Sequence, residues 1–195
     1  MKAVILAAWM LLVNAFPSAP DPAQLYPRLI TGAADSAGLV RPLGNGLAVA
    51  LVADQDGVLK EIKAADLKKM DLTPALAHRR ALDNLSAYFR AGKMKIDRLE
   101  GPRDAPYIMC SSYWLCSSLL LYSELADWAG EILGSEDLLL SVPHRDALIV
   151  FRQGKKTDPA AWKKFIAEKE AGAPDPLTPE LFELKDKAVR PLGGK

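Results

Sequence analysis

The feature of this sequence that most constrains the fold is a pair of apolar runs, residues 138–142 and 147–151, separated by a short polar segment. The segment consists of Pro143, His144, Arg145 and Asp146. Proline holds φ at about −65° and aspartate accepts hydrogen bonds from nearby backbone amides, so the segment favours a turn. Because both runs are apolar at nearly every position, the sequence predicts a β-hairpin that is covered on both faces and lies at the centre of a sheet.

The N-terminal half carries a second set of strand signals. Residues 39–43 and 47–53 flank an Asn-Gly pair, which accepts the positive φ angles of a tight hairpin turn. A further Asp-Gly pair leads into residues 58–62, so these runs predict a three-stranded antiparallel meander. Residues 25–31 are expected to form another strand, in which Pro27 favours a sheet edge or the start of the strand.

The longest predicted helix begins at Thr73-Pro74, because threonine can cap a helix and proline is tolerated at its first position. Gly92 is expected to end this helix, since glycine adopts the left-handed conformation common after a last turn. Apolar spacing of three and four predicts a side that faces the core, made of His78, Ala81, Leu82, Leu85 and Phe89.

Three more helices are predicted, at residues 64–70, 118–133 and 160–170. The second of these has a predicted core-facing stripe of Leu121, Leu125, Trp128 and Ile132. Further strands are predicted at residues 94–99, 105–110 and 177–184. The strand at 177–184 is expected at a sheet edge, followed by a loose tail at residues 190–195.

The order of these elements predicts an α+β fold, because the strands pair with their neighbours in sequence. We expect a mostly antiparallel sheet built from hairpins, with three main helices packed on one side of it. A chain of 195 residues suits one domain, which we place at residues 23–195 as a monomer. Lys and Arg number 25 and Asp and Glu 24, so the net charge of +1 gives no indication of a nucleic-acid partner.

Residues 1–22 form a separate N-terminal segment. Lys2 precedes an uncharged apolar run at residues 3–13, and together with the small and proline-rich residues that follow it resembles a secretory signal peptide. The run is too short for a stable membrane span. The alternative is an N-terminal helix packed on the core, followed by a linker. The first interpretation predicts an exported or periplasmic protein, and the second a cytoplasmic one.

The chain has two cysteines, Cys110 and Cys116. Their spacing is not a zinc pattern, because no second pair of cysteine or histidine residues accompanies them. In an exported chain they can form a disulfide, whereas in the cytosol they are expected to be two small buried side chains.

Three segments of the chain resemble a bacterial family known only as domain of unknown function 1444. They are residues 41–53, 76–85 and 139–148, of which the Val-Pro-His-Arg-Asp-Ala-Leu run at 142–148 is the most specific. The resemblance covers roughly residues 25–184 and lacks the family's usual N-terminal portion. Family members are usually cytosolic, which the signal-like segment does not match. The family has no established activity, so the resemblance implies no catalytic residue.

One function class that the residues permit is acyl transfer by a hydrolase. Candidate nucleophiles are Cys110, Ser112 and Cys116, within the serine-rich segment 110–118, and His144 with Asp146 can supply a base and the group that orients it. The chain has no phosphate-binding glycine loop, no Gly-x-Ser-x-Gly elbow and no His-Glu-x-x-His helix.

The other class is a non-enzymatic binding or structural domain, which we expect for this chain. Pro143, His144, Arg145 and Asp146 form a candidate binding turn, in which Arg145 can hold a carboxylate or phosphate through two hydrogen bonds. The simpler alternative is that Arg145 and Asp146 pair with each other and only shape the turn. We expect an unidentified protein partner, no cofactor and no metal. As a turn-tip side chain, His144 is expected to contribute less than about 1 kcal/mol to stability.

Overall fold

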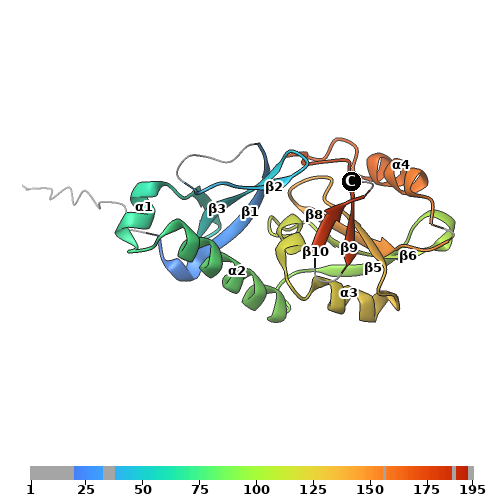
Figure 1. Ribbon diagram of the computed structural model, residues 1–195, viewed down its shortest axis with the longest axis horizontal. Coiled ribbons are helices and arrows are strands. Elements are labelled where there is room, and N and C mark those ends of the chain that lie inside the picture. The colour runs from blue at the N-terminus through green and yellow to red at the C-terminus, as the bar shows by residue number, and fades with distance from the viewer. Residues whose placement is uncertain (1–19, 33–37, 156, 186–187, 193–195) are drawn as a thin grey trace, which may run out of the picture.

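Two antiparallel sheets lie side by side along the long axis of the molecule (Figure 1). The computed structural model describes residues 20–32, 38–155, 157–185 and 188–192. Within these residues the predicted α+β class is confirmed, because the sheets are built from hairpins and accompanied by three helices of seven or more residues. These helices are α2 (Pro74–Arg90), α3 (Leu125–Leu133) and α4 (Pro159–Lys169).

The N-terminal sheet has four strands, with β3 (Leu47–Gln55) in its middle. β1 (Leu25–Thr31) pairs along one side of β3, whereas β2 (Arg41–Gly44) and β4 (Val58–Glu61) share the other side. The short helix α1 (Ala64–Lys69) follows, and then α2. The predicted pairings of β2 with β3 and of β3 with β4 are therefore confirmed, but the three strands do not form the predicted meander, because β2 and β4 pair along the same side of β3. β1 takes the opposite side of β3 and is an edge strand, as Pro27 indicated.

Side chains from other elements cover the outer edge of β1. The Asn84 side-chain amide, on α2, donates to the carbonyl oxygen of Leu25 at 2.8 Å, and the Ser118 hydroxyl donates to that of Pro27 at 2.8 Å. Unpaired carbonyls on an edge strand otherwise bind water or another strand. The edge of the N-terminal sheet is thus joined both to α2 and to the C-terminal half of the chain.

The segment before β1 is also packed. Pro22–Gln24 forms a 3₁₀ turn (η1) capped by Asp21, and Asn84 donates a second hydrogen bond, of 3.0 Å, to the carbonyl oxygen of Pro22. The predicted linker therefore ends in an ordered turn held by α2. The two interpretations of residues 1–19, a signal peptide or a packed helix, lie outside the described residues.

The C-terminal sheet has six strands in the order β10-β9-β7-β8-β6-β5. Their bounds are β5 (Ile96–Glu100), β6 (Pro106–Ser111), β7 (Leu138–Ser141), β8 (Ala147–Arg152), β9 (Leu181–Lys185) and β10 (Ala188–Pro191). The hairpin expected at the centre of a sheet is confirmed as β7–β8, which pairs with β9 on one side and β6 on the other.

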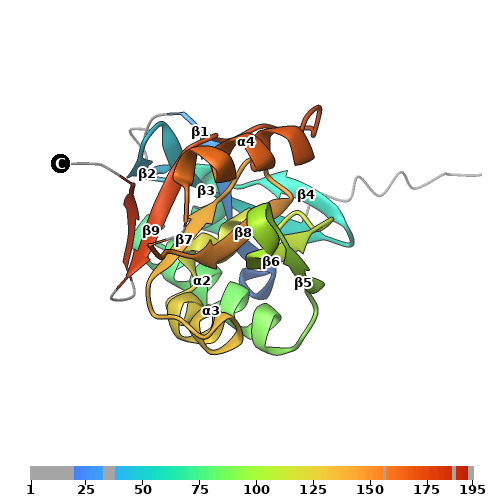
Figure 2. The same ribbon diagram turned by 90° about the vertical axis from the view of Figure 1, so that its right-hand side faces the viewer.

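Both faces of the β7–β8 hairpin are covered (Figure 2). Leu140 and Val150 belong to the main core, which also holds side chains of α3 and of the N-terminal sheet. Leu139 and Phe151 face the other way, toward Trp162 of α4. The expectation that all helices lie on one side is therefore wrong, because the apolar side chains of these strands point alternately to two faces and each face needs a cover.

The helix predicted at residues 118–133 is wrong over its first half. Ser117–Leu121 forms a 3₁₀ turn (η3), and α3 begins only at Leu125. The Ser118 hydroxyl is bound to Pro27 of β1, and Tyr122 has an extended backbone that breaks the helical path. The side of α3 that is buried consequently differs from the predicted stripe and consists of Leu125, Ala129 and Leu133.

Two smaller differences concern α2 and the last strands. The buried residues of α2 are Ala77, His78, Ala81 and Leu85, whereas Leu82 is 38% exposed and Phe89 packs only partly against the core. The last predicted strand, now β9, is not an edge, because β10 pairs on its outer side, and the last two residues of β10, Arg190 and Pro191, belong to the predicted tail.

Candidate functional site

The turn of Pro143, His144, Arg145 and Asp146 is fixed to two other segments of the chain. The Arg145 backbone amide donates to the carbonyl oxygen of Asp175 at 3.1 Å, and the Leu177 amide donates to that of Pro143 at 2.9 Å. The Ser117 amide, at the start of η3, donates to the carbonyl oxygen of Arg145 at 3.2 Å. The turn is therefore held between η3 and the segment after α4, rather than projecting into solvent.

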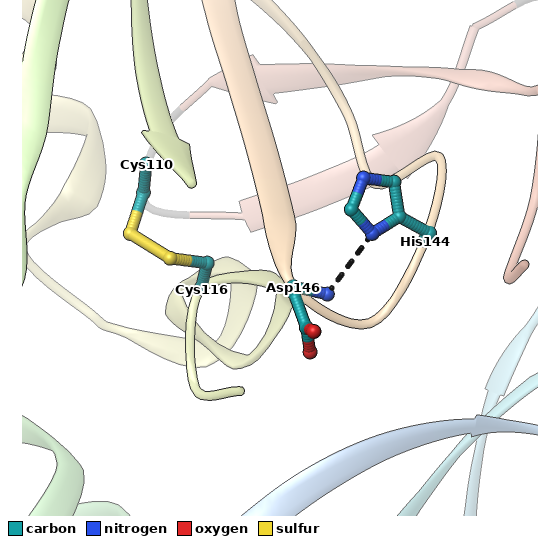
Figure 3. Close-up of a disulfide and its surroundings, with 4 residues drawn as sticks. All are labelled: Cys110, Cys116, His144 and Asp146. Carbon is teal, nitrogen blue, oxygen red and sulfur yellow. Dashed lines mark hydrogen bonds between the residues drawn. A yellow bond between two sulfur atoms is a disulfide. The ribbon is translucent and has the colours of Figure 1, made fainter. Parts of the chain in front are cut away.

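The His144 imidazole is buried within this arrangement, with 8% of the residue exposed. Its Nε2 lies 2.9 Å from Oε2 of Glu170, just beyond the end of α4, and its Nδ1 accepts the backbone N–H of Asp146 at 3.2 Å (Figure 3). Because Nδ1 accepts a hydrogen bond, the proton of a neutral ring lies on Nε2 and is donated to the carboxylate. The expectation of an accessible turn-tip imidazole is wrong, since the side chain is 11% exposed and contacts Glu170, and the backbone of the turn is hydrogen-bonded to the 175–177 segment.

The Arg145 guanidinium is also used within the chain. Its Nε and Nη2 donate to the two carboxylate oxygens of Asp146 at 2.6 and 3.1 Å, and its Nη1 lies 2.5 Å from Asp175. The hydrogen bond to Asp146 raises the pKa of Arg145 above its ordinary value. Arg145 thus forms within the turn the two-pronged carboxylate contact that the sequence allowed for an external ligand.

Cys110 and Cys116 are joined as a disulfide, with their Cα atoms 5.4 Å apart and both residues buried. The bond connects the end of β6 to the segment that leads into η3. Figure 3 shows the disulfide and the His144 ring on either side of the start of β8. While the disulfide is intact neither sulfur is a nucleophile, because nucleophilic attack requires the thiolate.

Ser112 is exposed in the loop that the disulfide closes, and its φ of 64° is in the left-handed region. Among the described residues, the His144 ring forms hydrogen bonds with Glu170 and Asp146. A serine nucleophile requires a base within hydrogen-bond reach of its hydroxyl. The structure therefore does not bring Ser112 and His144 together as a nucleophile and its base.

An aromatic cluster connects the two halves of the molecule and was not predicted from sequence. The Tyr26 ring on β1 lies 5.6 Å from Trp114, and Tyr88 on α2 stacks on Tyr113 at 5.4 Å with 14° between the ring planes. Burial, followed by the hydrogen bond to Tyr88, raises the pKa of Tyr113 well above that of an ordinary tyrosine. The cluster therefore favours the neutral phenol of Tyr113.

A pocket of about 530 Å³ lies at the opposite end of β8 from the 143–146 turn. It is lined by the turn between β5 and β6, the loop after β8 and the first turn of α4. We call it the β5–β6 pocket. Its lining includes Arg103, Arg152 and Lys155, which come from separate segments, so their proximity was not evident in the sequence.

Two further properties concern metal ions and membranes. Across residues 20–32, 38–155, 157–185 and 188–192, no three His, Cys, Asp or Glu side chains are grouped so that they could hold a metal ion. None of the helices in the same ranges has the length and apolar character needed to cross a bilayer.

The comparisons with known proteins give no relative for this chain. No family model matches it, and neither does any curated protein or solved structure. The resemblance to the domain of unknown function 1444 family stays a prediction.

Proposed function

We propose that this protein is a non-enzymatic binding domain in which the 143–146 turn is a structural element. The observation that carries the proposal is that the charged and polar side chains of the turn bind other residues of the same chain. His144 binds Glu170 and the Asp146 amide, and Arg145 binds Asp146 and Asp175. A catalytic base or a ligand-binding arginine would have to give up these contacts before acting, which costs free energy.

The disulfide supports a location outside the reducing cytoplasm. Disulfides form and persist in exported proteins and are rare in the cytosol, where thiols are kept reduced. We therefore propose that the chain is exported, in agreement with the signal-like character of its first residues. The bond closes only a short loop, so its contribution to stability is at most about 3 kcal/mol on the chain-entropy estimate.

The experiment that tests the proposal is an esterase assay with p-nitrophenyl acetate. We expect p-nitrophenolate to be released no faster than in buffer with a control protein that has no nucleophilic site. The rate should be the same for the Ser112→Ala and His144→Gln variants. Ser123→Ala is the matched control, because Ser123 is also an exposed serine and lies just after η3, outside the loop that the disulfide closes. Turnover that is lost in Ser112→Ala and kept in Ser123→Ala would show an enzyme and overturn the proposal.

We also propose a relationship with the domain of unknown function 1444 family. Two of the three similar segments coincide with hairpins, since residues 41–53 contain β2 and most of β3, and residues 139–148 contain the β7–β8 turn. An experimental structure of a family member provides the test. It should contain both hairpins, with a helix equivalent to α2 between them in the chain. A different order of strands around the second hairpin would contradict the proposed relationship.

A further inference from the structure

The β5–β6 pocket combines an apolar floor with a charged rim. Its floor includes Trp162, whose ring stacks on Phe151 with centroids 3.9 Å apart, together with Pro102, Pro106 and Ala161. A volume of about 530 Å³ suits a small organic molecule rather than a single inorganic ion. The floor therefore fits the apolar body of a ligand.

The β5–β6 turn is held against this floor by close packing. A Cβ atom on Gly101 would lie 2.4 Å from Cη2 of Trp162, so only glycine allows the backbone to approach the ring so closely. After Pro102 in the same turn, Arg103 and Asp104 have φ values of 56° and 57°. Non-glycine residues rarely adopt this conformation, and two in succession place the Arg103 backbone in a defined position at the rim.

The rim carries more positive than negative charge. Arg103, Arg152 and Lys155 line the pocket, and in the described part of the chain none of the three forms an ion pair. Of the two carboxylates in the lining, Asp158 accepts the backbone N–H groups of Ala160 and Ala161 at the start of α4. The other carboxylate in the lining is Asp104.

Thr157 forms two hydrogen bonds with residues that precede Lys155. The Thr157 hydroxyl donates to the carbonyl oxygen of Arg152 at 3.0 Å, and the Thr157 amide donates to that of Gly154 at 2.9 Å. The two contacts hold Thr157 beside Arg152 and Gly154 at the end of β8, next to Lys155. Cations on a preformed frame bind an anion at a lower entropic cost than cations on a flexible one.

We propose that the β5–β6 pocket binds a small organic anion, a carboxylate or phosphate ester with an apolar body. This inference deepens the proposed binding function and rests on it. The apolar body lies against Trp162 and the prolines, and Arg103, Arg152 and Lys155 bind the anionic group. Arginine suits this role because its planar fork matches the geometry of both carboxylate and phosphate.

The test is a titration of ¹⁵N-labelled protein, followed by NMR, with phenyl phosphate, benzoate, inorganic phosphate and benzyl alcohol. We expect saturable shifts of the pocket amides with the two aromatic anions, at a dissociation constant of about 1 mM or below. Inorganic phosphate, which has no apolar body, and benzyl alcohol, which has no charge, should bind more weakly. Stronger binding of phenyl phosphate than of benzoate assigns the site to phosphate esters, and the reverse assigns it to carboxylates.

Variants that remove one positive charge test whether the rim residues bind the anion. Arg103→Gln, Arg152→Gln and Lys155→Gln should each weaken the preferred aromatic anion about 3- to 10-fold, since each removes one charged donor at a solvent-exposed site. Arg79→Gln and Arg80→Gln are matched controls, because both arginines are exposed on α2, away from the pocket lining. These controls should leave the affinity unchanged.

Three outcomes overturn the inference. They are no saturable binding of either aromatic anion, binding that survives all three rim variants, and an equal loss in the Arg79 and Arg80 controls. None of these outcomes contradicts the proposed non-enzymatic role, which is contradicted only by ester turnover that depends on Ser112. The two proposals can therefore be judged separately.

Discussion

The contact between His144 and Glu170 predicts a large loss of stability in His144→Ala. The substitution removes a hydrogen bond to a carboxylate, which contributes about 1.5–3 kcal/mol, and an acceptor for the Asp146 amide, worth about 1 kcal/mol. The side chains of His144 and Glu170 are only 11% and 12% exposed, so water replaces a small part of what is lost. We expect the free energy of unfolding to fall by about 2.5–4 kcal/mol.

Urea unfolding followed by tryptophan fluorescence measures this loss. The matched control is Lys163→Ala, which breaks the 2.7 Å ion pair between Lys163 and Glu180, where the side chains are 44% and 49% exposed. An exposed pair of this kind contributes less than about 1 kcal/mol. The comparison separates the effect of a buried contact from that of removing any ion pair.

A double-mutant cycle with Glu170→Ala isolates the contact itself. If the imidazole and the carboxylate stabilise each other, the double variant should be more stable than the sum of the two losses predicts, by at least about 1 kcal/mol. A loss below about 1 kcal/mol in His144→Ala, or additive losses in the cycle, would refute the conclusion that this contact holds the turn. The turn would then have the accessible character expected from the sequence.

Three further predictions concern the core, the disulfide and the aromatic cluster. Ile149→Ala, in a fully buried position of β8, should lower the free energy of unfolding by about 2–5 kcal/mol in the same urea assay. In unreduced protein, mass spectrometry should find neither Cys110 nor Cys116 alkylated by iodoacetamide, and two alkylated thiols would contradict the disulfide. Because the pKa of Tyr113 is raised in the folded state, the stability that its neutral phenol contributes is fully present below the unfolded value of about pH 10 and is lost at higher pH. Tyr113→Phe should therefore reduce the loss of stability between about pH 9 and about pH 11, and an unchanged pH profile would contradict this assignment.

The hairpins could be predicted because their signals are local. Asn45 and Asp56 adopt φ values of 52° and 53° at the positions where Asn-Gly and Asp-Gly pairs indicated turns. The β7–β8 hairpin likewise follows from two apolar runs and the turn chemistry of the residues between them. Each of these elements is set by residues within a few positions of one another.

Contacts between distant segments explain what the sequence did not reveal. Glu170 lies 26 residues after His144, so no local pattern indicated that the imidazole is covered. The helix predicted from residue 118 fails for a similar reason, because the Ser118 hydroxyl binds a carbonyl oxygen 91 residues earlier in the chain. The β5–β6 pocket is lined by segments whose adjacency depends on the strand order of the sheet.

The side-chain cover on the outer edge of β1 has a consequence for the order of folding during synthesis. Asn84 and Ser118 lie 59 and 91 residues after the carbonyl groups they bind on Leu25 and Pro27. While the chain emerges from its N-terminus, β1 and β3 can pair before either side chain is available, and that edge is then open to other strands. We expect newly made chains to need protection from self-association until η3 has docked, whereas in the folded protein Asn84 and Ser118 bind two of the carbonyl groups on that edge.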